Sequence, residues 1–247
     1  MSAPRTPNPA HEISPGLVLR GVRPPLALRE YKLIAFDMDS TLINIECVDE
    51  IADAAGRRAE VSAITEAAMR GEIADFKDSL RRRLALLAGV SEAHLAHVYR
   101  ARLRLNPGAA ELVLACKAAG LKVLLVSGGF TYFADRLRER LALDFARSNR
   151  LEIVDGKLTG RLLMQDWGDI CDGAMKRQTV LDCCSLIGCT PAQAIVMGDG
   201  ANDLEMMAVA GLSVAYRAKP RVREQARVAI DLGGLDRLLE VFEPPAG

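Results

Sequence analysis

Residues 33–41 read LIAFDMDST, and the polarity of the chain changes abruptly within this stretch. Its first four residues are apolar and predict a buried strand, which two carboxylates and two hydroxyls follow directly. Residues two apart in an extended chain share a face, so we expect Asp37 and Asp39 to point into one crevice at the carboxyl end of the strand. Two close carboxylates repel each other, and a hard divalent cation would offset that repulsion.

The composition argues against a nucleic-acid-binding protein and against a membrane protein. The chain has 247 residues, and Lys plus Arg equal Asp plus Glu at 32 each. This balance offers no overall basic field for nucleic acid. The sequence has neither an apolar run that could span a membrane nor the apolar core of a signal peptide. The six cysteines form no Cys-x-x-Cys pair and predict reduced, mostly buried thiols. We therefore expect a cytoplasmic protein that binds neither nucleic acid nor a membrane.

The sequence pattern divides the chain into three parts. Residues 1–15 carry several prolines and predict a disordered tail. Residues 46–105 show apolar residues at helical spacing and predict a helical insertion, a cap domain. Residues 16–45 and 106–247 alternate strands with helices and predict the core domain. The expected fold is α/β, with a doubly wound parallel sheet and an inserted helical domain.

Two further buried strands are predicted to end in polar loops. Residues 121–126 lead into Ser127-Gly128-Gly129, and residues 194–197 lead into Gly198-Asp199-Gly200-Ala201-Asn202-Asp203. Lys176 lies near the start of a predicted helix between them. Because the carboxyl ends of parallel strands meet at one edge of a sheet, that edge would collect four acidic side chains, a serine hydroxyl and one ammonium group.

This set of side chains fits phosphoryl transfer, in which positioning and charge neutralisation supply most of the catalysis. Asp199 would join Asp37 and a backbone carbonyl near Asp39 around Mg²⁺. Asp203 would hold a metal-bound water or orient Lys176. Asp37 would then be the nucleophile, and Asp39 would act as general acid and afterwards as general base.

The phosphate group itself would be bound by uncharged donors and one cation. Ser127 and the amide groups beside Gly128 would bond its oxygens, and Lys176 would balance its charge. The pair Gly198-x-Gly200 after a strand also matches part of the dinucleotide-binding motif. Asp203 occupies the third glycine position of that fingerprint, and its charge would repel a pyrophosphate, so this alternative is disfavoured.

The four ordered motifs resemble those of the haloacid dehalogenase superfamily of phosphatases, and most closely the branch that acts on O-phosphoserine. The resemblance covers about residues 32–229. It implies that Asp37 forms an aspartyl-phosphate, that Asp39 is the acid and base, and that Asp37, Asp39 and Asp199 bind Mg²⁺. It also implies that the helical insertion is a cap that closes over the substrate.

The resemblance assigns further residues to substrate binding. Glu46 would meet the amino group of the substrate, Arg83 its carboxylate, and Phe76 would form an apolar wall of the pocket. The remaining substrate-binding residues are Ser127, Gly128, Lys176 and Asn202. A zwitterionic amino acid requires an anion for its ammonium and a planar fork for its carboxylate, which Glu46 and Arg83 supply. The ordinary alternatives are a first-turn helix acid for Glu46 and a solvated basic face for residues 81–83.

We therefore expect a Mg²⁺-dependent phosphomonoesterase that hydrolyses O-phosphoserine to serine and phosphate, the last step of serine biosynthesis. A phosphatase or phosphotransferase for a related amino-acid phosphate such as phosphohomoserine is the alternative with the same chemistry. A catalytically idle phospho-ligand binding protein would have lost Asp37, Asp39 or Lys176, and all three are present. We expect a small-molecule substrate and a monomer or homodimer.

Overall fold

A computed structural model describes residues 10–69, 73 and 75–244, which form a nine-stranded sheet in the order β1-β2-β9-β8-β7-β3-β4-β5-β6. The strands are β1 (Ala10–Ser14), β2 (Leu17–Arg20), β3 (Leu33–Phe36), β4 (Lys122–Phe130), β5 (Phe145–Val154), β6 (Lys157–Leu163), β7 (Ala194–Gly198), β8 (Leu212–Tyr216) and β9 (Val228–Ile230). The strands from β9 to β5 in this order are parallel, whereas β1, β2 and β6 pair antiparallel with their neighbours. The predicted parallel sheet is confirmed, with antiparallel strands added at both edges.

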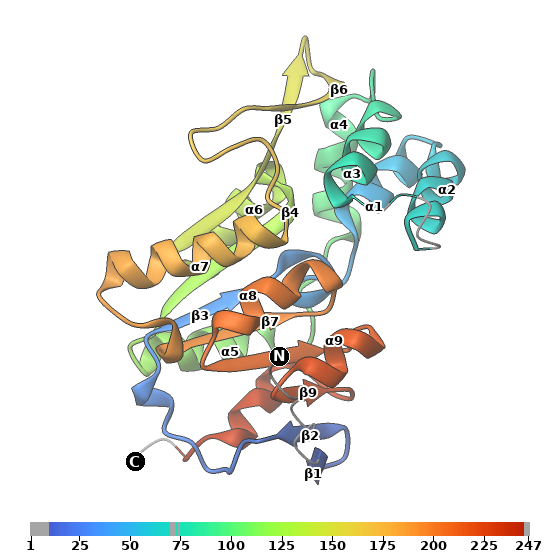
Figure 1. The fold of residues 1–247 in the computed structure, drawn as a ribbon. Helices are drawn as coiled ribbons and strands as arrows, with labels where there is room; N and C mark the ends of the chain where they lie inside the picture. Colours follow the sequence, from blue (N-terminus) through green and yellow to red (C-terminus); the bar gives the residue numbers. More distant parts are fainter. Residues whose placement is uncertain (1–9, 70–72, 74, 245–247) are drawn as a thin grey trace, which may run out of the picture.

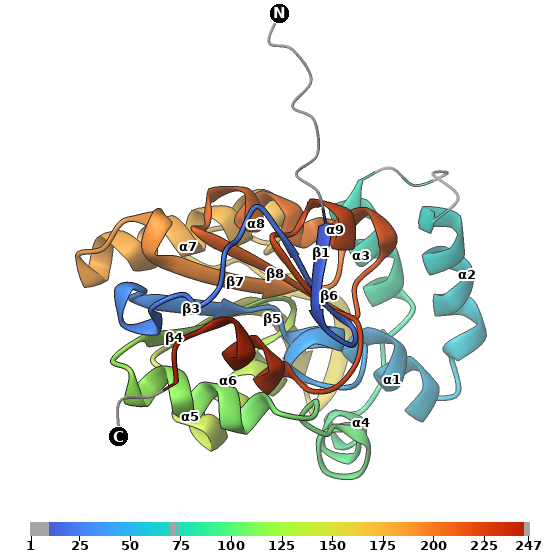
Figure 2. The same cartoon turned by 90° about the horizontal axis from the view of Figure 1, so that it is seen from below.

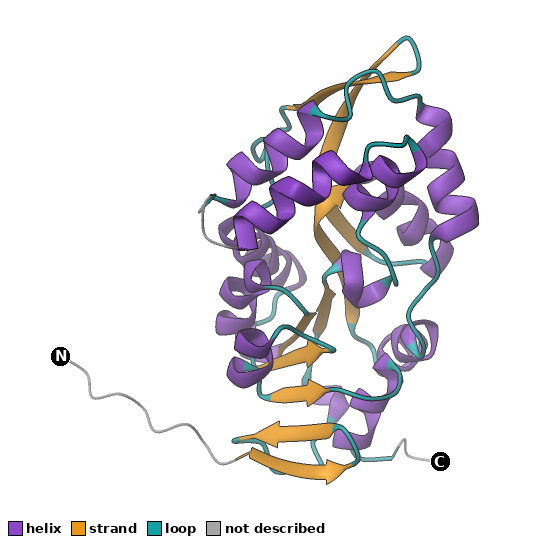
Figure 3. Cartoon of the chain, turned by 90° about the vertical axis from the view of Figure 1, so that its right-hand side faces the viewer, coloured by secondary structure: helices purple, strands orange, loops and turns teal. Residues whose placement is uncertain are grey.

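Helices cover both faces of the sheet, as a doubly wound fold requires. The helices are α1 (Cys47–Ala54), α2 (Arg58–Met69), α3 (Phe76–Ala85), α4 (Glu92–His97), α5 (Ala109–Ala118), α6 (Thr131–Leu141), α7 (Gly173–Ile187), α8 (Leu204–Val209) and α9 (Pro220–Gln225). Figure 2 shows α5 and α6 on one side of the central strands and α7 and α8 on the other. Seen from the side in Figure 3, the strands form a ladder between these two helical layers.

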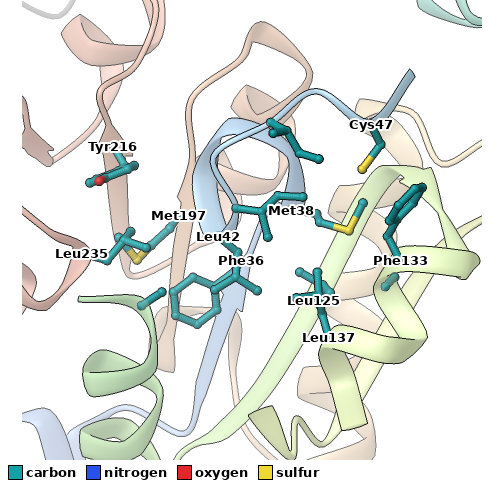
Figure 4. Close-up of a cluster of buried hydrophobic side chains, with 14 of the residues drawn as sticks. Phe36, Met38, Leu42, Cys47, Leu125, Phe133, Leu137, Met197, Tyr216 and Leu235 are labelled. Atoms are coloured by element: carbon teal, nitrogen blue, oxygen red, sulfur yellow. The ribbon is translucent and has the colours of Figure 1, made fainter. Parts of the chain in front are cut away.

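The alternation of side chains along β3 explains the two layers. Ile34 and Phe36 point into one hydrophobic cluster, and Leu33 and Ala35 into the other. Figure 4 shows Phe36 within the first cluster, which β4, β7 and α6 also line. Burying a side chain of this size contributes about 1.5–3 kcal/mol, so both faces of β3 hold it at the centre of the sheet. Asp37 follows at its carboxyl end.

Helices α1 to α4 lie together at one end of the sheet, beside the β5–β6 hairpin (Figure 1). These helices agree with the helical character predicted for residues 46–105, as far as the structure describes that range. Three backbone hydrogen bonds join this helical region to the hairpin: Gly89 N–H to Leu158 O at 2.7 Å, Leu158 N–H to Val90 O at 2.8 Å, and Glu92 N–H to Gly156 O at 2.8 Å. The hairpin turns at Asp155-Gly156, where the two residues have positive φ angles of 49° and 71°.

The predicted disordered tail is wrong for its last residues. Residues 10–14 form β1, which pairs antiparallel with β2, and β2 in turn pairs with β9. The prolines at positions 4, 7, 9 and 15 suggested disorder, but the segment between the last two is free to pair. Consequently β1 forms the edge of the sheet, and β2 lies one strand inside it. The rest of the predicted tail, residues 1–9, lies outside the described residues.

A second correction concerns β4. The sequence predicts a strand over 121–126 followed by a loop, whereas β4 continues through Ser127, Gly128 and Gly129 to Phe130. The pairing of Phe130 with Asn149 on β5 holds this extension, after an irregularity in register beyond Val126. Two adjacent glycines disfavour a strand locally, and the neighbouring strand overrides that tendency.

The structure also gives the state of the cysteines and the character of the helices. All six cysteines are unpaired thiols, and all but Cys189 are buried. None of the helices in the described residues has the length and apolar character needed to cross a membrane.

Candidate active site

The carboxyl ends of β3, β4 and β7 open into a cavity of about 260 Å³. All but two of the residues selected from the sequence line it: Asp37, Asp39, Glu46, Phe76, Arg83, Ser127, Gly128, Asp199 and Asn202. The other two, Lys176 and Asp203, are inaccessible to solvent. The structure therefore brings together residues that are up to 166 positions apart in the sequence.

Lys176 lies in the first turn of α7 and forms two ion pairs beneath the cavity. Its Nζ is 2.6 Å from Asp37 Oδ1 and 2.7 Å from Asp203 Oδ1. Asp203 also accepts hydrogen bonds at Oδ2 from the backbone N–H groups of Asp199 and Gly200, at 3.1 and 3.0 Å. These contacts favour the second role considered for Asp203, which is to orient Lys176.

Three carboxylates form a group that fits a divalent cation. One oxygen each from Asp37, Asp199 and Asp203 lies within 4.8 Å of the others. Three negative charges against the single charge of Lys176 leave an excess of two, which a divalent cation balances. The Asp39 carboxylate is not in this group of described residues, so the assignment of Asp39 to the metal rests on its backbone carbonyl alone.

The same crowding shifts the pKa values of these groups. Burial is the largest cause that raises the pKa of Asp37, followed by repulsion from Asp203, while Lys176 opposes the rise. Burial followed by repulsion from Asp203 raises the pKa of Asp199 to about 7. Burial alone would lower the pKa of Lys176, but the charges of Asp203 and Asp37 outweigh it and the pKa lies above its ordinary value. A bound cation would favour the ionised carboxylates.

The Asp39 carboxylate occupies a different environment from that of Asp37. Burial, followed by repulsion from Glu46, raises the pKa of Asp39 to about 8, and hydrogen bonds from Cys47 oppose the rise. A carboxyl group with this pKa is largely protonated at neutral pH and is able to donate a proton. The two aspartates that follow β3 therefore differ in position and in the charged groups around them, Asp203 and Lys176 for Asp37 and Glu46 for Asp39.

The backbone after β3 adopts a strained conformation. Ser40 has a φ angle of 57°, in the left-handed region that residues other than glycine rarely adopt. Its hydroxyl donates to Glu46 at 2.6 Å, and its N–H donates to the carbonyl of Ile45 at 3.1 Å. The buried Asn106 amide donates to the carbonyls of Thr41 and Ile43 at 2.8 and 3.0 Å. From the sequence, Asn106 is predicted only to begin the second segment of the core domain.

Ser127 and the two glycines after it form the floor of the cavity. Ser127 is buried, and its Oγ accepts a hydrogen bond from the Gly129 N–H at 2.8 Å. A Cβ atom at Gly128 would lie 2.9 Å from the Phe76 ring, and one at Gly129 would lie 2.6 Å from Met38. A larger residue at either position would force the Phe76 ring or the end of the Met38 side chain to shift, so glycine allows the close packing of this backbone against α3 and the turn after β3.

The far end of the cavity is lined by α1, α3 and the residue before α1. Desolvation is the largest cause that raises the pKa of Glu46, and its hydrogen bond from Ser40 opposes the rise. Arg83 faces the cavity rather than the solvated side of α3, and its buried Nε has no hydrogen-bond partner among the described residues. Sequence reasoning missed two charged lining residues, Asp49 and Lys219. Neither lies in a motif, so only folding reveals them.

Comparison with known proteins identifies the family. Residues 31–211 match the haloacid dehalogenase-like hydrolases. This match spans most of the chain, which therefore belongs to the haloacid dehalogenase-like hydrolase family.

Particular relatives are closer still. A protein from Polaromonas sp. (strain JS666) called phosphoserine phosphatase is 71% identical over 232 residues, which cover 94% of this chain and 98% of the relative. Two solved structures are described as a substrate-bound phosphoserine phosphatase complex and as a phospho-aspartyl intermediate analogue of phosphoserine phosphatase. Each is 37% identical to this chain with a TM-score of 0.79, and the match covers 86% of this chain and 99% of the other.

Proposed function

We propose that this protein hydrolyses O-phosphoserine to serine and phosphate, as a Mg²⁺-dependent phosphomonoesterase that forms an aspartyl-phosphate on Asp37. One observation carries the proposal. A single cavity is lined by Asp37, which pairs with the buried Lys176, and by Glu46 and Arg83 from the helical region, and the Arg83 Nε has no hydrogen-bond partner among the described residues. The groups from the sheet suit a phosphate ester, and those from the helical region suit an amino acid. The high identity to a phosphoserine phosphatase supports this assignment.

The metal would be held by carboxylates of the described group, Asp37 and Asp199, with the backbone carbonyl of Asp39. Bound there, Mg²⁺ would supply charge neutralisation for the phosphate oxygens. Asp203 already accepts hydrogen bonds from Lys176 and from two backbone N–H groups, so its part is to fix the Asp199 loop and Lys176.

The chemistry of the protein's own residues proceeds in two steps. An oxygen of Asp37 attacks phosphorus while the bond from phosphorus to the serine oxygen breaks, and Asp39 gives its proton to the departing serine. Asp39, now a carboxylate, takes a proton from a water molecule that attacks the phosphorus. The bond from phosphorus to Asp37 then breaks, and inorganic phosphate leaves. The raised pKa of Asp39, about 8, suits the first of these proton transfers.

The phosphate and amino-acid groups of the substrate are bound by different parts of the cavity. Ser127, the Gly128 backbone, Lys176 and Asn202 would bind the phosphate. Glu46 would bind the ammonium and Arg83 the carboxylate, with the Phe76 ring as an apolar wall. The support is that Arg83 and Phe76 both lie on α3 and face the same cavity as Asp37.

Residues 46–105 would form a cap that closes over the substrate. Ion pairs from α3 to the loop before α7 support this proposal: Arg81 lies 2.5 Å from Asp169, and Lys77 lies 3.3 Å from Asp172. Because backbone hydrogen bonds join residues 89–92 to the β5–β6 hairpin, the hairpin would move with the cap. The cytoplasmic location and the monomeric or homodimeric state stay predictions.

The decisive experiment is a substrate profile. Phosphate release is measured from O-phosphoserine, phosphohomoserine, phosphothreonine and p-nitrophenyl phosphate, each with Mg²⁺ and with EDTA. We expect a strong, Mg²⁺-dependent preference for O-phosphoserine. Added acceptor alcohols would separate a phosphotransferase, because that enzyme would make a new phosphoester in place of free phosphate.

Other results would change the assignment in defined ways. Metal-dependent hydrolysis that favours phosphohomoserine would keep the mechanism and change the substrate. Absence of hydrolysis for every ester, with retained binding, would indicate a phospho-ligand binding protein.

A further inference from the structure

One buried amide that the sequence analysis did not select contacts two parts of the site. Asn149 on β5 is inaccessible to solvent. Its Nδ2 donates to the carbonyl oxygen of Gly128 at 2.7 Å, and its Oδ1 accepts from the backbone N–H of Cys171 at 2.7 Å. Because buried polar groups are costly to leave unpaired, these two bonds fix the orientation of the Asn149 side chain.

The bond to Gly128 determines where the next N–H points. The Gly128 carbonyl and the Gly129 N–H belong to one planar peptide unit and point in opposite directions. Asn149 holds the carbonyl, and the N–H on the other side donates to Ser127 Oγ at 2.8 Å. Because Ser127 Oγ accepts this hydrogen bond, its own hydroxyl hydrogen can be donated to an acceptor in the cavity.

The bond to Cys171 reaches the segment that introduces Lys176. Asp172, the next residue, caps α7 by accepting from the Met175 N–H at 2.9 Å. The Lys176 N–H donates to the Asp172 carbonyl at 2.8 Å. The side chain of Asn149 thus bridges the backbone beside Ser127 and the first turn of the helix that carries Lys176.

We propose that Asn149 is a positioning residue that holds the two phosphate-binding elements, the Ser127–Gly129 backbone and the start of α7, at a fixed separation. The inference deepens the proposed function and rests on it, because that function assigns the phosphate group to these elements. A merely structural amide would affect folding stability and leave phosphate affinity unchanged.

Substitution of Asn149 by aspartate tests the bridge. The carboxylate of Asn149→Asp keeps an acceptor for Cys171 and loses the donor to the Gly128 carbonyl. We expect the inhibition constant of inorganic phosphate to rise about tenfold, since one buried hydrogen bond is replaced by a repulsive contact. The KM values for O-phosphoserine and p-nitrophenyl phosphate should rise by the same factor. The inhibition constant of L-serine should not change, because Glu46 and Arg83 are untouched.

Gln165→Glu is the matched control. Gln165 Nε2 donates to the carbonyl of Ser148, the residue before Asn149, at 3.1 Å, and that bond reaches neither phosphate-binding element. It makes the same change from amide to carboxylate against a main-chain carbonyl, and we expect a phosphate inhibition constant equal to that of the unmodified protein.

An unchanged phosphate inhibition constant in Asn149→Asp, with or without a lower melting temperature, would overturn the proposal. If that variant does not fold, the uncharged Asn149→Ser removes the same bond and the same criterion applies. Calorimetric titration of each protein with inorganic phosphate gives a readout that does not depend on turnover. If the unmodified protein hydrolyses neither ester, the proposed function fails, while the titration still decides the role of Asn149.

Discussion

The two ends of the cavity are built differently. At the end formed by the sheet, Lys176 is inaccessible to solvent and bonded to both Asp37 and Asp203. At the end formed by the helical region, Glu46 is accessible to solvent, and the buried Arg83 Nε has no hydrogen-bond partner in the part of the chain that the structure describes. At the first end Lys176 is therefore paired with side chains of the protein itself, whereas at the second the Arg83 Nε is left free to bond a ligand.

This difference suggests separate roles for the two ends, one in the rate of the reaction and the other in the choice of substrate. Groups fixed before the substrate arrives need no reorganisation when charge develops, so the sheet end should determine the rate of the chemical step. The helical end offers the Arg83 cation and the acidic side chains of Glu46 and Asp49, away from the groups proposed to bind the phosphate. It should therefore determine which ester is bound. Three changes test this division, from the largest expected effect to the smallest.

Substitution Asp37→Asn should abolish the chemical step, which the sheet end is expected to determine. An amide cannot form the acyl-phosphate, so we expect kcat to fall by more than about a thousandfold for every ester. Phosphate release gives the rate, and circular dichroism checks that the fold is kept. Asp135→Asn, the same change at an exposed site on α6, should retain full activity. Activity near that of the unmodified protein in Asp37→Asn would mean that another group is the nucleophile.

Substitution Arg83→Ala should act on the helical end alone. Loss of a charge-assisted fork for the carboxylate should raise KM for O-phosphoserine about 10- to 100-fold, while KM for p-nitrophenyl phosphate stays within about twofold. Arg82→Ala is the control, because the neighbouring Arg82 is exposed and pairs with Asp78 at 2.9 Å. Equal changes for both esters in Arg83→Ala would show that Arg83 does not bind the carboxylate.

The stability of the metal-free protein should depend on pH through the carboxylates of the site. Folding raises the pKa of Asp199 from 3.8 to about 7 and that of Asp39 from 3.8 to about 8. At pH values above 3.8 and below about 7 to 8, the folded state therefore binds more protons than the unfolded state. The free energy of unfolding falls as pH rises through this window. Mg²⁺ should therefore raise the melting temperature by about 2–4 °C more at pH 8 than at pH 5.

Thermal scans with EDTA and with Mg²⁺ at both pH values measure this effect. In Asp199→Asn the difference between the two pH values should shrink, because one of the titrating ligands is gone. A Mg²⁺ shift that is the same at pH 5 and pH 8 would contradict the assignment of Asp199, with its raised pKa, to the metal site.

Much of the fold was accessible from local signals. Short apolar runs predicted β3, β7 and the first part of β4, because a strand buried on both faces needs apolar residues throughout. Apolar residues at helical spacing predicted the helical insertion, in which α1 to α4 lie. The failures, β1 and the end of β4, occur where proline or glycine disfavours a strand and only a paired neighbour stabilises it.

The sequence by itself determined that the residues proposed for the chemistry lie together, because the motifs place Asp37, Ser127 and Asp199 at or just beyond the ends of predicted buried strands, and parallel strands bring those ends together. Only the tertiary structure decided the partners of those residues. Asn149 and Asp49 carry no local signal, since a lone polar residue in a strand or helix has the same sequence pattern whether it faces solvent or a site. Which of the two it faces depends on contacts between segments distant in the chain, and those exist only once the chain has folded.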